Sequence, residues 1–197
     1  MKPLSLSKPH VIITIGIPGS GKSFFAEHFA TSFKAPIVSF ERVRKELIES
    51  PTLSSGEDKI VNKITNYLLE EVLKTGRTVV YDGQTGLRIE RVTIVKKARD
   101  AGYEPLFVWI QTDLTTAKKR ATRHTAGKIT MTDEQFDNKM KRFSAPHFTE
   151  KAIVVSGMHT YNSQLKIVLK RLVEPRAKVD EQPAAGRTPT NRHTLIR

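Results

Sequence analysis

The octapeptide GIPGSGKS at residues 16–23 constrains the fold of this chain more than any other feature. It matches the pattern G-x-x-x-x-G-K-[ST] at every position, follows the apolar run VIITI and precedes the segment FFAEHFATSF. Glycines in such a loop let the backbone curl, so that several N–H groups converge on phosphate oxygens at the positive end of the following helix. The alternative is a glycine-rich turn with a chance lysine, and the complete pattern between a strand and a helix argues against it. We therefore predict a nucleotide-binding loop.

Individual side chains of this loop have predicted roles. Lys22 is expected to reach the β- and γ-phosphates of ATP and to act in catalysis, and the Ser23 hydroxyl is expected to bind Mg²⁺. The predicted nucleotide-binding residues are Gly16, Pro18, Gly19, Ser20, Gly21, Lys22 and Ser23.

Short β-type runs alternate with helical patterns along the chain, which is typical of a parallel sheet wrapped by helices. We expect an α/β, three-layer P-loop NTPase fold: a mostly parallel five-stranded sheet with helices on both faces and a small helical lid. The expected strands are residues 11–16, 35–40, 78–83, 103–112 and 152–157. One helix is expected directly after the loop at 16–23. The other expected helices are residues 41–49, 54–75, 88–101, 113–124, 132–143 and 161–173.

Apolar residues at helical spacing indicate which helix faces pack on the sheet. Ser54 and Glu57 have the spacing of a capping box at the start of one of these helices. Trp109 is expected in the core, on the fourth strand. The three expected stripes are Phe24, Phe25, Phe29 and Phe33; Ile60, Ile64, Tyr67, Leu68 and Val72; and Ile89, Val92, Val95 and Ala98.

Composition limits the classes of protein that fit. The chain contains no cysteine, so a disulfide framework and a thiolate metal site are both excluded. No stretch approaches the ~20 apolar residues that a bilayer requires, so we expect a soluble, cytoplasmic protein without membrane contact. The formal net charge of +13 favours polyanionic partners such as nucleotides or nucleic acid.

Two domain assignments follow from periodicity and composition. Residues 1–174 are expected to form one kinase-type domain, with a polar lid at about 113–143. Residues 175–197 contain five basic and two acidic residues without periodicity, and we predict a basic, disordered tail.

Asp82 ends the third expected strand. Because the carboxyl ends of parallel strands converge on the binding crevice, its carboxylate is a candidate to hold a Mg²⁺-bound water beside Ser23. The alternative is an ordinary Asp-Gly turn with Gly83. We favour the metal assignment.

Glu41 and Arg44 follow the second expected strand, which we expect to neighbour the strand before the loop at 16–23. At positions i and i+3 of a helix start, the two side chains lie on one face. Glu41 is a candidate general base and Arg44 a candidate ligand for an anionic part of the acceptor. An ordinary solvated helix start, with its acid first and its bases later, explains the same spacing equally well.

The polar segment KKRATRH carries Lys119, Arg120 and Arg123. Arg120 and Arg123 are candidates to fold over ATP as part of the lid and stabilise charge in the transition state. The alternative is a solvated basic helix face, so the lid assignment depends on the rest of the architecture.

The loop, the SFERVR segment, the run VVYDGQTGLRIERVTIVKKARDAGYEPLFVWI and KKRATRH occur in an order that resembles the phage-type polynucleotide 5′-kinase domain and the zeta-toxin-like kinases. The resemblance covers about residues 10–157. It implies a five-stranded parallel sheet, ATP and Mg²⁺ as cofactors, and γ-phosphate transfer to a hydroxyl. It also implies catalytic roles for Glu41, in place of the family's aspartate, and for Arg120 and Arg123, with Arg44 on the acceptor and Asp82 near the metal. Gly83-Gln84-Thr85 replaces the family's usual Thr-Asn.

Three hypotheses for the function stay open. The first is a kinase for the 5′-hydroxyl of a polynucleotide or oligonucleotide, with a basic, aromatic segment at 139–151 as a further contact for nucleic acid; inward packing of its aromatic residues is the alternative. The second is a kinase for a nucleoside, sugar, antibiotic or nucleotide-sugar. The third is a non-catalytic module that senses ATP and binds nucleic acid. The preference for ATP over GTP and the oligomeric state are also left open.

Overall fold

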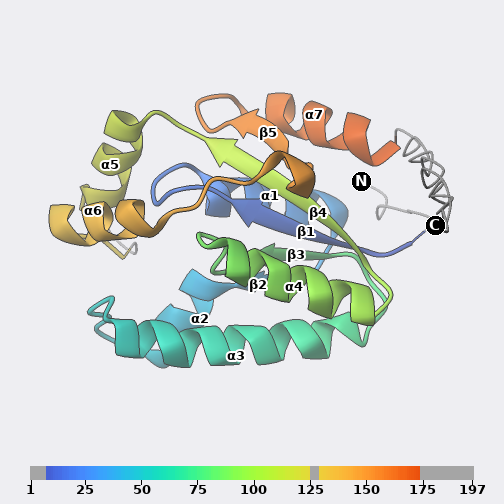
Figure 1. Ribbon diagram of the computed structural model, residues 1–197, viewed down its shortest axis with the longest axis horizontal. Helices are drawn as coiled ribbons and strands as arrows, with labels where there is room; N and C mark the ends of the chain where they lie inside the picture. The colour runs from blue at the N-terminus through green and yellow to red at the C-terminus, as the bar shows by residue number, and fades with distance from the viewer. Residues whose placement is uncertain (1–7, 125–128, 174–197) are drawn as a thin grey trace, which may run out of the picture.

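The computed structural model describes residues 8–124 and 129–173, and it contains a five-stranded parallel sheet between two layers of helices (Figure 1). The strand order is β2-β3-β1-β4-β5, and each neighbouring pair is parallel. This confirms the expected fold class. The strands are β1 (His10–Ile15), β2 (Ile37–Ser39), β3 (Val79–Asp82), β4 (Glu104–Gln111) and β5 (Ile153–Ser156).

Helices join successive strands and close the structure. Two of them, α5 and α6, lie beyond the carboxyl ends of the strands (Figure 1). The helices are α1 (Lys22–Phe33), α2 (Phe40–Leu47), α3 (Ser55–Leu73), α4 (Arg88–Asp100), α5 (Leu114–Thr122), α6 (Asp133–Arg142) and α7 (Tyr161–Val173), with a short 3₁₀ helix η1 (Phe148–Glu150).

The position of β2 differs from the expectation. β3 lies between β2 and β1, with Val79 opposite Val11 and Val80 opposite Ile37. All four residues of β3 are buried, as in an interior strand, whereas β2 has only three residues and forms an edge. Alternating strands and helices indicate a parallel sheet without specifying its strand order, so this prediction was wrong.

The two faces of the sheet carry separate cores. On one face α1 and α7 contribute side chains such as Phe25, Phe29 and Val168. On the other face α3 and α4 contribute side chains such as Leu69 and Ile94. Phe24, which we expected in the first core, is 49% exposed.

The buried face of α3 is displaced by one position from the expected stripe. Val61, Thr65 and Leu69 are buried, whereas Ile60 and Tyr67 are each 59% exposed. The hydroxyl of Thr65 donates a hydrogen bond to the Val61 carbonyl oxygen at 2.7 Å, so a polar residue is accommodated inside the core. Periodicity identifies the most apolar face, and tertiary contacts selected a different one.

The same difference occurs on α4. Arg91, Ile94 and Ala98 are buried, whereas Ile89 and Val92 are 68% and 50% exposed. Burial of an arginine is possible here because each nitrogen of its guanidinium group donates to an oxygen acceptor.

The acceptors of Arg91 come from segments far apart in the sequence. Its Nε and Nη2 atoms donate to the two Glu150 carboxylate oxygens at 2.7 and 2.9 Å. Its Nη1 atom donates to the carbonyl oxygens of Thr85 and Ser144 at 3.0 and 2.9 Å. The hydrogen bonds from Arg91 lower the pKa of Glu150 below its ordinary value. Arg91 therefore fixes the turn after β3 against the segment that follows α6.

Replacing Arg91 by methionine is expected to lower the free energy of unfolding by about 3–5 kcal/mol, because it leaves a largely buried carboxylate without its cation. Chemical denaturation at neutral pH measures this loss. Arg99→Ala, an exposed site on the same helix, is the control and should change stability by less than about 0.5 kcal/mol. Equal effects of the two substitutions would contradict the structural role of Arg91.

The expected lid forms two helices outside the main layers. Each buries one anchor, Ala117 in α5 and Phe136 in α6. The predicted tail at 175–197 lies outside the described residues, as do residues 125–128 of the lid.

Within the part of the chain that is described, none of the helices combines the length and the apolar character needed to cross a membrane. Trp109 is partly buried against the core on the α3 and α4 face, as expected of a strand residue.

Candidate active site

The loop at 16–23 connects β1 to α1 at the carboxyl edge of the sheet. A hydrogen bond of 3.1 Å from the Ser20 N–H to the Ile17 carbonyl oxygen closes its turn, and α1 begins at Lys22. Gly19 has a φ of 76° and lies against the Ala117 carbonyl oxygen of α5, so a side chain there would collide with the lid helix. The loop therefore combines a turn that requires glycine at a positive φ, a helix start and direct contact with α5.

Lys22 lies folded over this loop. Its Nζ atom donates to the Ile17 carbonyl oxygen at 3.0 Å. Burial lowers the pKa of Lys22, and the nearby carboxylates of Asp82 and Glu41 oppose that change. An anion bound at the loop would stabilise the charged ammonium form of Lys22, which burial disfavours.

Asp82 is held in place at the end of β3. Its side chain is buried, and its Oδ1 atom accepts a hydrogen bond of 2.7 Å from the Thr14 hydroxyl of β1. The Thr85 hydroxyl donates to the Thr14 carbonyl oxygen at 2.7 Å and so links the turn after β3 to the same strand. Sequence reasoning missed Thr14 and Thr85, because the contacts join residues about 70 positions apart.

The residues at this edge fit a nucleotide with Mg²⁺. The Ser23 hydroxyl and the Asp82 carboxylate are oxygen ligands of the kind that Mg²⁺ prefers. Ser20 has a buried hydroxyl without a hydrogen-bond partner among the described residues. An unpaired polar atom in a loop predicted to bind phosphate is consistent with a ligand that supplies the missing contact.

Glu41 lies in the first turn of α2, which is capped by a hydrogen bond of 3.4 Å from the Arg42 N–H to the Ser39 hydroxyl. Burial raises the pKa of Glu41, Arg44 opposes this change, and the Asp82 carboxylate adds to it. The structure thus brings Lys22, Glu41 and Asp82 to one edge of the sheet. This occurs although β2 does not neighbour β1, because all the strands end on the same side.

Arg44 points into the protein. Its side chain is 1% exposed, it forms an ion pair of 3.0 Å with Glu57 and a second with Asp58, and its guanidinium carbon lies 5.0 Å from the Phe40 ring centroid. The Nε atom is 3.9 Å from a Glu41 carboxylate oxygen and has no hydrogen-bond partner among the described residues. The guanidinium group that we expected to face the acceptor is therefore paired with two carboxylates of the protein itself.

Arg120 and Arg123 occupy different places on the lid. Arg120, near the end of α5, donates from Nη1 to the Gly157 carbonyl oxygen at 3.1 Å. The loop of Gly157 lies beside the loop at 16–23, where the Thr112 hydroxyl donates to the Ser20 carbonyl oxygen at 3.0 Å. Arg123 follows the last turn of α5 and is exposed. Arg120 is thus anchored at the rim of the site.

Lys139 of α6 is a further cation at this edge. Its Nζ atom donates to Asp58 at 2.6 Å, and its charge acts on both Lys22 and Glu41. The sequence had placed Lys139 only in a basic segment, because Asp58 lies 81 positions away.

The aromatic residues of the basic segment at 139–151 divide between two environments. Phe143 packs against the core, whereas His147 and Phe148 are exposed, with their ring centroids 4.2 Å apart and their planes tilted by 47°. Inward packing, one of the two alternatives for this segment, therefore applies to only one of the three rings.

The parallel sheet, the glycine-rich loop between β1 and α1 and the two helices beyond the sheet together form a P-loop-type α/β domain. Within that class the chain belongs to the AAA domain family, whose model matches residues 11–146. No curated protein matches the sequence significantly.

Solved structures of known proteins share the fold. A gluconokinase from Sinorhizobium meliloti 1021 is 18% identical, with a TM-score of 0.62 over 83% of this chain and 91% of its own. The APS kinase CysC of Mycobacterium tuberculosis, in complex with AMPPNP and APS, is 18% identical, with a TM-score of 0.60 over 84% of this chain and 98% of its own. A chain of the Pnkp1/Rnl/Hen1 complex is 20% identical, with a TM-score of 0.50 over 68% of this chain and 45% of its own. At these identities the likeness concerns the fold alone.

Proposed function

We propose that this protein is an ATP-dependent phosphotransferase that moves the γ-phosphate to a hydroxyl acceptor. The observation that carries the proposal is the convergence of Lys22, Glu41 and Asp82 at the carboxyl edge of the sheet, beside the loop at 16–23. A cation for the phosphates, a carboxylate for the metal and a carboxylate with a raised pKa are the groups that phosphoryl transfer to a hydroxyl requires.

In the proposed reaction Glu41 accepts the proton of the acceptor hydroxyl. The acceptor oxygen forms a bond to the γ-phosphorus, and the bond from that phosphorus to the bridging oxygen breaks, with ADP as the leaving group. Lys22 stabilises the charge on the phosphate oxygens, as Arg120 and Arg123 do from the proposed lid at 113–143. Ser23 and Asp82 would hold Mg²⁺, which neutralises charge on the β- and γ-phosphates when it is bound.

We propose the 5′-hydroxyl of a polynucleotide or oligonucleotide as the acceptor. Three features support it: the net charge of +13, the position of Lys139 on α6, from which its charge acts on Glu41, and the exposed rings of His147 and Phe148 on a basic segment. Arg44 as an acceptor contact stays a prediction. An acceptor anion would have to displace Glu57 or Asp58 from its guanidinium group.

A small-molecule acceptor is the second candidate. Two of the similar structures are named a gluconokinase and an APS kinase, and both cover most of this chain. A third candidate is an ATP-sensing, nucleic-acid-binding module, which predicts slow hydrolysis without an acceptor product.

Transfer from γ-labelled ATP with Mg²⁺ to a panel of 5′-hydroxyl oligonucleotides, nucleosides and sugars tests the proposal, with Lys22→Ala protein as the blank. We expect labelled DNA or RNA oligonucleotide. Label confined to a small molecule would overturn the acceptor assignment while retaining the kinase. Tight ATP binding without any labelled acceptor would favour the sensing module.

A further inference from the structure

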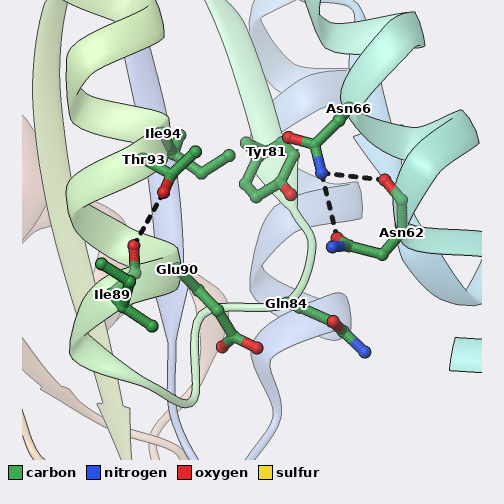
Figure 2. A pocket seen from close by; sticks show the side chains of 8 residues that line it. All are labelled: Asn62, Asn66, Tyr81, Gln84, Ile89, Glu90, Thr93 and Ile94. Atoms are coloured by element: carbon green, nitrogen blue, oxygen red, sulfur yellow. Dashed lines mark hydrogen bonds between the residues drawn. The ribbon is translucent and has the colours of Figure 1, made fainter. Parts of the chain in front are cut away.

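A cavity of about 140 Å³ lies between α3 and α4, on the side of the sheet opposite α1 (Figure 2). Tyr81 of β3 points into it between Asn62 and Asn66 of α3 and the first turns of α4. Its volume is close to that of a ~150 Å³ cavity able to take a benzene ring. The cavity is therefore of a size for one six-membered ring.

The Tyr81 hydroxyl, at this cavity, lacks a hydrogen-bond partner among the described residues. Its residue is fully buried. A buried donor left unpaired is unfavourable, so native proteins rarely retain one without a water or a ligand to satisfy it.

Asn62 and Gln84 add amide groups around the cavity, and Glu90 is the ionisable acid in its lining (Figure 2). The lining contains no lysine, arginine or histidine. A phosphate or carboxylate group would find no cation here, whereas a neutral group with donors and acceptors along its edge would find partners.

The apolar part of the lining favours a flat ring. Ile89 and Ile94 of α4 lie across the cavity from the asparagines of α3 (Figure 2). A nucleobase has apolar faces and a polar edge, and amide side chains pair well with such edges. A sugar ring has hydroxyls around its whole perimeter and suits a wall of isoleucine less well.

The cavity adjoins the catalytic edge. Tyr81 directly precedes Asp82, and the Tyr81 ring ends against Gly83, where a side chain would overlap the ring. Gln84 comes two residues after Asp82, so their Cα atoms lie at most about 7 Å apart. That separation is on the scale of one nucleoside.

We propose that this cavity binds the base of the acceptor's 5′-terminal nucleotide, and that its size selects a pyrimidine. The inference rests on the proposed function, because it assigns a subsite to that same active site. Asn62, Tyr81 and Gln84 contact the polar edge of the base, and Ile89 packs on its face.

The test compares kcat/KM for oligonucleotides that differ only at the 5′-terminal position: two pyrimidines, two purines and an abasic residue. We expect the pyrimidine ends to be preferred about tenfold over the abasic end, the range of one good base-edge contact. Tyr81→Phe should reduce the rate with pyrimidine ends to that with the abasic end. Because it removes an unpaired hydroxyl and keeps the ring, its thermal midpoint should equal or exceed that of the wild type.

Tyr103→Phe is the matched control. Its hydroxyl belongs to the same core but donates to the Leu73 carbonyl oxygen at 2.8 Å. This variant should lose stability and retain the pyrimidine preference. Asn62→Asp is a second probe, because it keeps an acceptor for the Asn66 amide and replaces the other amide group by a carboxylate oxygen. It should lose the preference as well.

Calorimetric titration with cytidine, uridine and a hexose separates the subsite from the reaction. Nucleoside binding that is weakened by Tyr81→Phe would support the subsite, whether or not an oligonucleotide is phosphorylated. A lack of oligonucleotide phosphorylation would contradict only the proposed acceptor. Equal kcat/KM for all five ends, or nucleoside binding unchanged by Tyr81→Phe, would overturn the subsite. Hexose binding that depends on Tyr81 would overturn the assignment of a base.

Discussion

Replacing Lys22 by alanine is expected to lower the rate of phosphoryl transfer by about a hundredfold to a thousandfold. Lys22 is the cation that can follow charge from the β- to the γ-phosphate, and loss of one preorganised charge-stabilising group costs on the order of 10²–10³ in kcat. Burial lowers the pKa of Lys22, and the negative charge of bound phosphates would favour its charged ammonium form. Initial rates with γ-labelled ATP and the best acceptor measure the effect.

Lys166→Ala, an exposed lysine of α7, controls for the loss of one positive charge from a highly basic protein. It should keep wild-type transfer rates. Normal transfer by Lys22→Ala protein would remove the site assignment altogether, since no other residue of the loop at 16–23 is a cation.

Changing Glu41 to glutamine is expected to lower kcat by about 10²–10⁴-fold, the usual contribution of a general base. ATP affinity should change little, because the carboxylate is assigned to the acceptor's proton and not to the nucleotide. Glu46→Gln, an exposed glutamate on the same helix, is the control and should retain full activity. A fully active Glu41→Gln enzyme would exclude Glu41 as the base.

The pH dependence of the rate gives an independent measure of Glu41. Burial raises its pKa above the ordinary 4.5, so the carboxylate form needed for catalysis is lost as the pH falls through that raised value. We expect kcat/KM to show an acid limb above pH 4.5 in the wild type and to lose that limb in Glu41→Gln. An acid limb unchanged by the substitution would assign the titration to another group.

Several local features could be predicted from the sequence because neighbouring residues determine them. The Ser54 hydroxyl accepts a hydrogen bond of 3.3 Å from the Glu57 N–H and caps α3 as expected. The second half of the predicted capping box did not form. The Glu57 carboxylate instead accepts from Thr52 and Leu53 and pairs with Arg44, a residue 13 positions away.

On α3 and α4 the apolar pattern of the sequence did not predict which residues are buried. Tyr67 and Ile89 lie on the most apolar stripes and are exposed, whereas Thr65 and Arg91 are buried. Hydrogen bonds to protein acceptors make Thr65 and Arg91 compatible with the core. Helical spacing alone did not predict those acceptors. The same holds for Arg44, whose ion pairs with Glu57 and Asp58 join residues 13 and 14 positions apart.

The roles proposed for the carboxylates and arginines stay predictions. The alternation of strands and helices and the turn at 16–23 between β1 and α1 could be predicted from the sequence. These features depend on contacts between residues close along the chain, where backbone geometry and spacing leave few choices. The strand order, the buried faces of the helices, the enclosure of Arg44 and the cavity around Tyr81 could not be predicted in this way. Each of these depends on pairing and packing between distant segments, which many sequences with the same local pattern would satisfy differently.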